Sequence, residues 1–342
     1  MANLKEKTKC NIYFTKKIQI ASNTIILNED NKCPSINDDG SVNVTSEEDE
    51  NSLLCSAPDS YGISYYFRGN VTNNYVYFAG YYWRIVRING DDSIRLIYDG
   101  TTIHKNGEAS EDRIIGTSAF NTSYDDNAYV GYMYGTPGSS SYTETHKNIN
   151  DSTIKKYIDT WYKNNLLNTE YEQYLKDNIF CNDRSISTGL PDGYSNKGYG
   201  KEKTAYRWLY GFLYNPNGDE NPYEKLTCSQ QNDAFTVNDT TSGNGSLKYP
   251  IGLLSTDEVV LGGGWRSEIS NYYLYTGTDY WQMTPGDFFG TSSVVRFIRA
   301  NGYAKDGLDI FKESGVKPVI NLKANALISG LGTIESPYLV TK

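Results

Sequence analysis

The clearest alternation between apolar runs and polar turns lies near residue 85. Two apolar runs, Tyr81–Ile88 and Ile94–Tyr98, flank the tripeptide Asn89-Gly90-Asp91. Asn, Gly and Asp tolerate the positive φ angles of a tight β-turn, and both runs are rich in residues that favour strands. The sequence therefore predicts an antiparallel hairpin over 81–98.

Helical spacing is clearest between residues 151 and 180. Apolar side chains recur there at intervals of three and four residues: Ile154, Tyr157, Ile158, Trp161 and Tyr162. This stripe predicts a helix with one apolar face, and either Asp151 or Ser152 can cap its first turn. Thr169 and Glu172 have the spacing of a capping box and predict a second, shorter helix that leads to Cys181.

Other patterns predict shorter elements. Ser255 and Glu258 form another capping box, and Gly262 follows where that helix would end. The aromatic side chains of Tyr206–Tyr214 alternate with a period of two, which predicts a strand whose rings form either core or a stacking platform. Tyr129–Tyr134 matches a further short strand.

The segment 272–322 has two apolar ends and a mostly polar middle. Its last part predicts a buried strand from four apolar residues: Val316, Val319, Ile320 and Leu322. Pro318 is compatible with that strand only where the strand begins or at a sheet edge. Because the middle combines glycines with polar and aromatic residues, we predict a display loop over 286–315. The alternative is an ordinary buried strand formed by four residues of the loop: Val294, Val295, Phe297 and Ile298.

Charge and composition narrow the classes of partner. The 342 residues include 32 Lys and Arg against 41 Asp and Glu, which gives a net charge of −9. A phosphate backbone gains nothing from this charge, so we expect no nucleic-acid partner. The 31 tyrosines are about three times the ordinary frequency. They are typical either of half-buried strands in a β-rich surface protein or of a dedicated binding face.

The chain has five cysteines: Cys10, Cys33, Cys55, Cys181 and Cys228. No C-x-x-C pair is present and neither His104 nor His146 is near a cysteine, so no zinc-type spacing exists. Cys181 and Cys228 flank a long glycine-rich insertion, and we predict a disulfide between them because it would remove much loop entropy. Cys33 and Cys55 could pair as well, leaving Cys10 over. The alternative is five reduced thiols in a cytosolic protein.

The first 57 residues predict a stalk or linker. A strand-like run, Ile18–Leu27, precedes the acidic run Glu47–Glu50, a composition that is normally solvated. The chain has no run of 18 apolar residues, and its start lacks the apolar part of a signal peptide. Either the protein is cytosolic or an export signal or anchor has been removed. We expect the second, with a membrane link only through that anchor, and a compact domain over 58–342.

Motifs for catalysis and for ligands give no match. The stretch around Tyr199 has the glycines of a P-loop without its lysine, and neither G-x-S-x-G nor H-E-x-x-H occurs. The acidic triplet 125–127 lacks the spaced oxygen ligands of a calcium loop and favours a solvated turn. His104 and His146 lie in polar stretches and are expected to be exposed. We therefore expect no catalytic residue, no metal and no cofactor.

Several segments together resemble a family of tyrosine-rich anchored surface proteins of gut bacteria. They cover most of 59–322 and include FAGYYWRIVRINGDDSIRLIYDG, YPIGLLSTDEVVLGGG, YYLYTGTDYWQMTP and GVKPVINLK. More distantly, the C-terminal part is similar to the formylglycine-generating-enzyme branch of the C-type lectin fold, through these residues: Tyr280, Trp281, Thr284, Pro285, Val316, Pro318 and Val319. The cysteine pair of sulfatase-modifying members and the Trp-Asn-Asp motif of calcium-dependent lectins are absent. Neither activity is therefore implied.

The resemblance implies an α+β protein with a C-type-lectin-like domain that displays a variable final loop, as do variable proteins diversified by retroelements. We expect an extracellular, cell-surface binding protein that recognises a protein or glycan partner. The expected contact residues are Trp265, Arg266, Tyr280, Asp287, Phe288, Phe289, Arg296, Arg299, Asn301, Tyr303 and Asp306. Two alternatives remain: a glycan-active hydrolase with paired carboxylates, and a structural surface-layer or pilus component.

Overall fold

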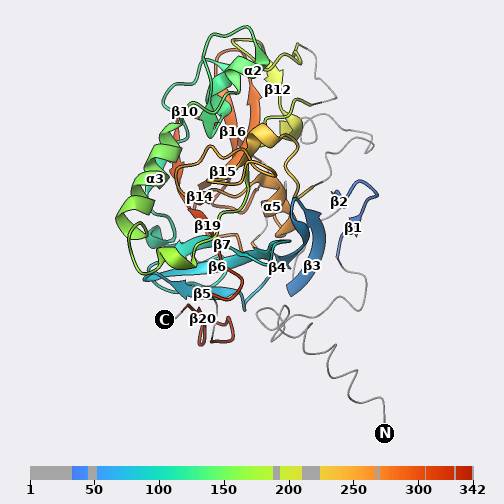
Figure 1. The fold of residues 1–342 in the computed structure, drawn as a ribbon. Coiled ribbons are helices and arrows are strands. Elements are labelled where there is room, and N and C mark those ends of the chain that lie inside the picture. Colours follow the sequence, from blue (N-terminus) through green and yellow to red (C-terminus); the bar gives the residue numbers. More distant parts are fainter. Residues whose placement is uncertain are drawn as a thin grey trace.

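Strands and loops make up most of the molecule, with few helices among the described residues (Figure 1). The computed structural model describes residues 33–44, 52–187, 193–209, 224–265, 268, 270–304, 306–326 and 329–340. Two larger sheets and three two-stranded sheets organise these residues. The fold is therefore α+β and loop-rich, as the sequence predicts.

The larger sheet contains the predicted hairpin. Its strands are β3 (Ser52–Asp59), β4 (Gly62–Gly69), β5 (Tyr75–Phe78), β6 (Tyr81–Ile88), β7 (Ile94–Gly100), β14 (Ile251–Gly252), β19 (Val319–Leu322) and β20 (Tyr338–Leu339). The order β14-β19-β7-β6-β4-β3 places the hairpin strands at the centre, and β5 pairs with β6 and β20. Strand β19 begins directly after Pro318, the position at which a proline interrupts no ladder hydrogen bond. The predicted hairpin over 81–98 and the predicted buried strand after Pro318 are therefore both confirmed.

The second sheet is built mainly from the C-terminal part of the chain. Its strands are β8 (Thr117–Ala119), β12 (Thr204–Ala205), β15 (Tyr280–Phe288), β16 (Ser293–Ile298), β17 (Asp306–Asp309) and β18 (Glu313–Gly315). The order is β17-β16-β15-β18-β8, and β12 also pairs with β15. In Figure 1, β15 and β16 lie above the larger sheet, and α5 (Thr256–Leu261) lies between the two sheets and contacts both.

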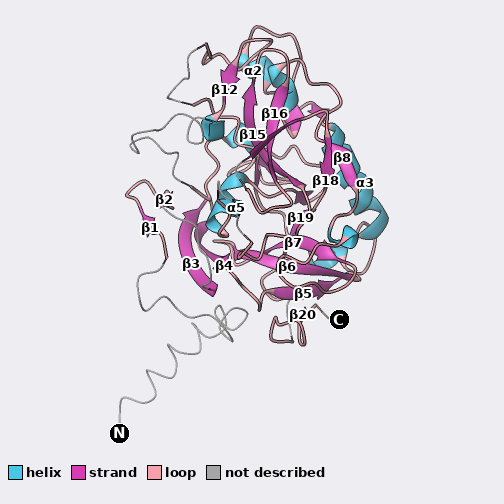
Figure 2. Ribbon diagram, turned by 180° about the vertical axis from the view of Figure 1, so that it is seen from behind, coloured by secondary structure: helices cyan, strands magenta, loops and turns pink. Residues whose placement is uncertain are grey.

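The remaining elements flank these sheets. They are the paired strands β1 (Ser35–Ile36) and β2 (Val42–Asn43), β9 (Met133–Tyr134) and β10 (Asn150–Asp151), and β11 (Phe180–Cys181) and β13 (Ala234–Phe235), the helices α2 (Tyr142–Thr145) and α3 (Thr153–Asn165), and the 3₁₀ turns η1 (Glu111–Arg113), η2 (Asn127–Val130), η3 (Glu172–Tyr174) and η4 (Gln231–Asp233). Seen from behind, α3 runs alongside β8 and β18 (Figure 2). Of the short strand expected over Tyr129–Tyr134, only the last two residues form a strand, which is β9.

Both capped helices follow their sequence signals. The Ser152 side chain, and not Asp151, caps α3 by accepting from the Lys155 backbone N–H. The predicted stripe turns inward, because Ile154, Ile158 and Tyr162 are buried. At α5, the Ser255 hydroxyl and the Glu258 carboxylate form the reciprocal capping box that their spacing predicts.

The second predicted helix does not form. After Thr169 the chain makes only η3, because the Thr169 hydroxyl donates to the Leu166 carbonyl 2.6 Å away. The Glu172 carboxylate accepts from the Asn168 backbone N–H at 2.8 Å. The two side chains therefore fix a turn and do not cap each other's backbone.

The aromatic segment after β12 is not a strand at its start. Tyr206 follows β12, and residues 207–209 are helical. Tyr206 and Trp208 are buried, which agrees with core and not with a stacking platform. Residues 210–214 lie outside the described residues.

The stalk boundary predicted after residue 57 falls inside β3. Every second residue of β3 is buried, including Leu53, Cys55 and Ala57, since the strand pairs with β4 along its whole length. Cys55 is also bonded to Cys33, with 5.7 Å between the Cα atoms. Residues 52–57 thus belong to the sheet, whereas Ile18–Leu27 lies outside the described residues.

The second disulfide is the one predicted from loop entropy. Cys181 and Cys228 are bonded with their Cα atoms 5.5 Å apart.

None of the helices in the described ranges is both long and apolar enough to cross a bilayer.

The segment 286–315 is mostly sheet, which corrects the prediction of a display loop. It holds the end of β15, all of β16, β17 and β18, and the turns between them. The alternative strand is confirmed, because Val295, Phe297 and Ile298 lie buried in β16. The polar residue Arg296 is compatible with a buried strand, because its guanidinium donates to the Trp208 carbonyl at 2.7 Å inside the protein.

Candidate functional site

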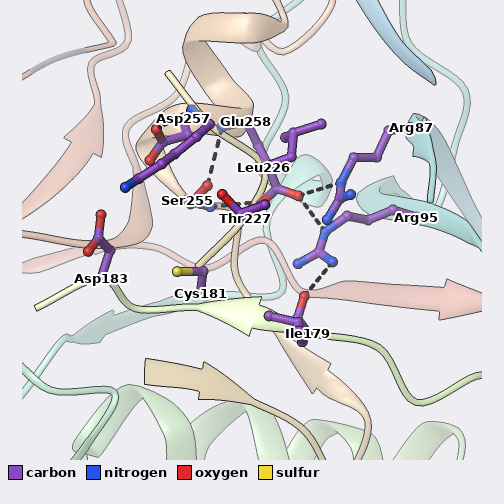
Figure 3. A pocket seen from close by; sticks show the side chains of 11 residues that line it. Arg87, Arg95, Ile179, Cys181, Asp183, Leu226, Thr227, Ser255, Asp257 and Glu258 are labelled. Carbon is purple, nitrogen blue, oxygen red and sulfur yellow. Dashed lines mark hydrogen bonds and ion pairs between the residues drawn. The ribbon is translucent and has the colours of Figure 1, made fainter. Parts of the chain in front are cut away.

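Opposite charges meet where the larger sheet packs on α5. Glu258 lies 2.7 Å from Arg95 Nε and 3.0 Å from Arg87 Nε, and Arg87 also reaches Asp59 at 2.9 Å. Figure 3 shows both guanidinium groups pointing at Glu258. All four residues are buried, and we call them the paired cluster. Burial raises the pKa of the Glu258 carboxyl, but Arg95 and Arg87 outweigh burial and hold this pKa below its ordinary value.

Part of the paired cluster lines a small cavity, and a second set of charges lies on another side of that cavity. Arg207 bridges Asp183 and Asp257, and the Trp208 indole N–H donates to Asp257 at 2.9 Å. Cys181, in the disulfide, forms another part of the wall (Figure 3). The cavity measures about 10 Å³, which is about the space that one water needs.

This charged cavity does not have the form of a sugar-cleaving site. Asp183 and Asp257 are close together, as a glycosidase requires, but one guanidinium binds both. Burial raises the pKa of Asp183, but Arg207 and the Ser185 hydroxyl together outweigh burial and lower this pKa, so the carboxyl is a poor proton donor at neutral pH. A space for one water does not admit a sugar ring.

Several of the residues predicted to contact a partner lie inside the protein. Four of them are buried: Tyr280, Asp287, Phe288 and Arg296. Burial raises the pKa of Asp287 to about 6, against the lowering effect of the Tyr194 hydroxyl, which donates to it at 2.9 Å, and of Arg296. These four side chains belong to the sheet and cannot touch a partner while the sheet is intact.

The remaining predicted residues separate into two groups at opposite ends of β16. Arg299, Asn301 and Tyr303 follow its C-terminal end. Trp265 joins them through a β-bridge to Tyr303, and Asn301 donates to Glu268 at 2.8 Å. Phe289 precedes its N-terminal end and is 56% exposed. Arg266 lies outside the described residues, and Asp306 pairs its backbone with Phe297 in β17.

Two further exposed aromatic residues, which the sequence did not single out, lie near the N-terminal end of β16. The rings of Tyr124 and Phe311 are 4.7 Å apart and are 43% and 44% exposed. Their backbones meet at Ser293, which donates to the Tyr124 carbonyl and accepts from the N–H of Ile310. Ser293 is the first residue of β16, four positions after Phe289. We call Tyr124, Phe289 and Phe311 the aromatic patch.

Polar groups surround the aromatic patch. Lys203 Nζ lies 5.3 Å from the Phe289 ring centroid, and the Tyr194 ring meets Phe289 edge-on at 5.7 Å. Exposed ion pairs join Lys201 to Asp125 and Lys312 to Asp309. Charged groups of both signs therefore lie close to the aromatic patch.

The two histidines are buried, contrary to the expectation from their polar sequence context. His104 Nε2 lies 2.7 Å from Asp112, which ties its loop to η1. His146 packs at 3.9 Å from the Tyr142 ring, and burial lowers its pKa well below the ordinary value. Among the described residues, no group of three or more His, Cys, Asp or Glu side chains is arranged to hold a metal ion.

Comparisons with known proteins add no assignment. No family model, no curated protein and no solved structure matches the chain.

Proposed function

We propose that this protein is an extracellular binding protein that recognises a glycan through the aromatic patch. The observation that carries the proposal is the exposure of three aromatic rings around the start of β16. Exposed aromatic side chains that cluster mark interaction surfaces, because a ligand that covers them removes apolar area from water. The patch includes Phe289, one of the residues expected from the sequence to contact a partner.

The chemistry around the rings fits a glycan. Here the charged groups of Lys203, Asp125 and Asp309 lie beside or near the rings. A sugar can place its apolar ring face on an aromatic side chain while its hydroxyl groups bond to ammonium and carboxylate groups at the rim.

The extracellular location and the finer fold belong to the same proposal. Two disulfides, Cys33–Cys55 and Cys181–Cys228, fit an oxidising compartment. A C-type-lectin-like architecture is supported by the loop-rich α+β fold and by the buried positions of Trp281 and Val319 in adjoining sheets. The partner in this proposal is a glycan on another cell or molecule, bound at a surface.

A glycan array tests the proposal. Phe289→Ala, Tyr124→Ala and Phe311→Ala should each weaken retention of the glycans that the parent binds, by about fivefold for a loss of about 1 kcal/mol. Tyr77→Ala is the matched control, since Tyr77 is a 40% exposed tyrosine on β5, in the other sheet. Unchanged glycan binding by the three patch variants contradicts the proposal. So does a parent that captures a deglycosylated protein and no glycan.

A further inference from the structure

A second cavity lies beside the C-terminal end of α3. It measures about 330 Å³ and opens between the end of α3, η3 and the segments 237–238 and 248–250. Its apolar wall consists of Leu167, Leu175, Val237 and Pro250. The volume lies in the range of small-molecule sites.

Two carboxylates, those of Glu172 and Asp177, line this cavity beside the apolar wall. Glu172 accepts hydrogen bonds from the Asn168 N–H and the Tyr162 hydroxyl. Asp177 accepts from the backbone N–H groups of residues 237–239. These donors are all neutral, and neither carboxylate joins an ion pair within the described ranges. Other carboxylates at the surface have such partners, for example Asp309 with Lys312.

We propose that this cavity binds an organic cation that joins an aliphatic chain to a primary ammonium group. The aliphatic chain would cover Leu167, Val237 and Pro250, which are only partly buried. The ammonium would pair with Glu172 and Asp177, whose negative charge the protein leaves without a cation. A sugar fits less well, because the Tyr249 ring is already stacked on Tyr162, with the centroids 4.8 Å apart.

Lys248 also lines this cavity and places a positive charge there. Its side chain is exposed, and its ammonium lies 5.5 Å from the Tyr249 ring centroid. A positive charge at this place repels a cationic ligand. Removing it should therefore strengthen binding, whereas removing the charge of Glu172 should weaken binding.

The probe for the test is hexylammonium, and hexanoate is the matched anion of equal chain length. Saturation-transfer NMR and calorimetry with the full chain should detect hexylammonium binding that weakens with added salt, and no binding of hexanoate. Glu172→Gln should weaken binding about fivefold, the value of one partly exposed ion pair. The new amide keeps a carbonyl oxygen for the Asn168 N–H, so the turn is preserved. Lys248→Gln should strengthen binding, and the exposed Glu111→Gln should leave it unchanged.

The ammonium can come from a free amine or from a lysine side chain, and N-acetyl-lysine amide distinguishes the two sources. If the protein binds both N-acetyl-lysine amide and hexylammonium, the ammonium comes from a lysine side chain. If it binds hexylammonium but not the lysine derivative, the ammonium comes from a free amine. Three results overturn the proposal. They are equal binding of hexanoate, indifference of hexylammonium binding to Glu172→Gln, and no binding at concentrations on the order of 10 mM. The aromatic-patch variants do not touch this cavity, so the two proposals fail independently.

Discussion

Two buried clusters of charge lie on the same hairpin, and they are composed differently. The paired cluster sets Arg87 and Arg95 against Asp59 and Glu258. The second cluster sets three cations against the single carboxylate of Asp99. Arg113 lies 2.7 Å from it, Lys317 lies 3.3 Å from it, and Arg84 lies 3.9 Å from it. We call these four residues the cationic cluster.

The protein accommodates the excess charge of the cationic cluster in two ways. Arg84 donates to the Asn74 side chain and to the Val71 carbonyl, both at 2.6 Å, and its guanidinium lies 3.8 Å from the Tyr75 ring centroid. Lys317 gives up much of its charge instead. Burial lowers the pKa of Lys317, and Arg113 adds to this lowering. Asp99 opposes it only in part, so the pKa is about 7.

The comparison shows two ways in which one sheet can bury cations. Where carboxylates are available, the arginines stay charged and the network depends on each acid. Where they are scarce, backbone carbonyls, an aromatic ring and deprotonation replace them. The paired cluster should therefore be sensitive to mutation and the cationic cluster sensitive to pH.

The largest expected effect is the loss of Glu258. Glu258→Gln keeps the shape and the capping hydrogen bond from Ser255, but it leaves Arg95 and part of Arg87 without a counter-charge. Breaking a buried pair on one side costs about 3–5 kcal/mol. Urea unfolding at neutral pH measures this loss, with the exposed Glu111→Gln as the control. A loss no larger than that of the control would mean that the paired cluster contributes little to stability.

Elements with local signals could be predicted from the sequence. The capping box of Ser255 and Glu258 and the turn at Gly90 need only neighbouring residues, and both were predicted correctly. The charge network that Glu258 joins could not be predicted, because Arg87 and Arg95 lie more than 160 positions away in sequence. A capping-box glutamate looks the same in sequence whether it is exposed or paired.

The candidate site shows the same limit. Asp287 and Arg296 look exposed by residue type, but pairing of β15 with β16 and contact with Tyr194 and Trp208 bury them. Phe289, by contrast, is exposed because it sits in the turn between β15 and β16. The sequence did not single out Tyr124, because isolated exposed aromatic residues are common. Only its contact with the Phe311 ring in the folded protein distinguishes it.

A smaller effect sharpens the contrast through pH. Because the folded pKa of Lys317 is about 7 and its unfolded value is 10.5, the folded state binds fewer protons than the unfolded state between these pH values. Stability from this group therefore rises with pH in that window, by about 3 kcal/mol between pH 7 and pH 10. Lys317→Met should remove the rise.

The test is the difference in unfolding free energy between the parent and Lys317→Met, measured by urea at several pH values. The unfolding free energy of the parent should increase relative to that of the variant as pH increases. A constant difference would show that Lys317 stays fully charged beside Asp99 and that the cationic cluster is a set of ion pairs like the other.

The smallest effect concerns a single buried acid outside both clusters. The folded pKa of Asp287 is about 6 and its ordinary value is 3.8, because burial outweighs the Tyr194 hydrogen bond and the charge of Arg296. Between these pH values the folded state binds more protons, so stability from this group falls as pH rises from 4 to 7, by about 2 kcal/mol. Asp287→Asn stays neutral and still accepts from Tyr194, so it should be about as stable as the parent at pH 4 and more stable at pH 7. The exposed Asp38→Asn serves as the control in the same urea series. An Asp287→Asn variant that is less stable than the parent at pH 7 would mean that Arg296 compensates the carboxylate fully, as the arginines of the paired cluster do for Glu258.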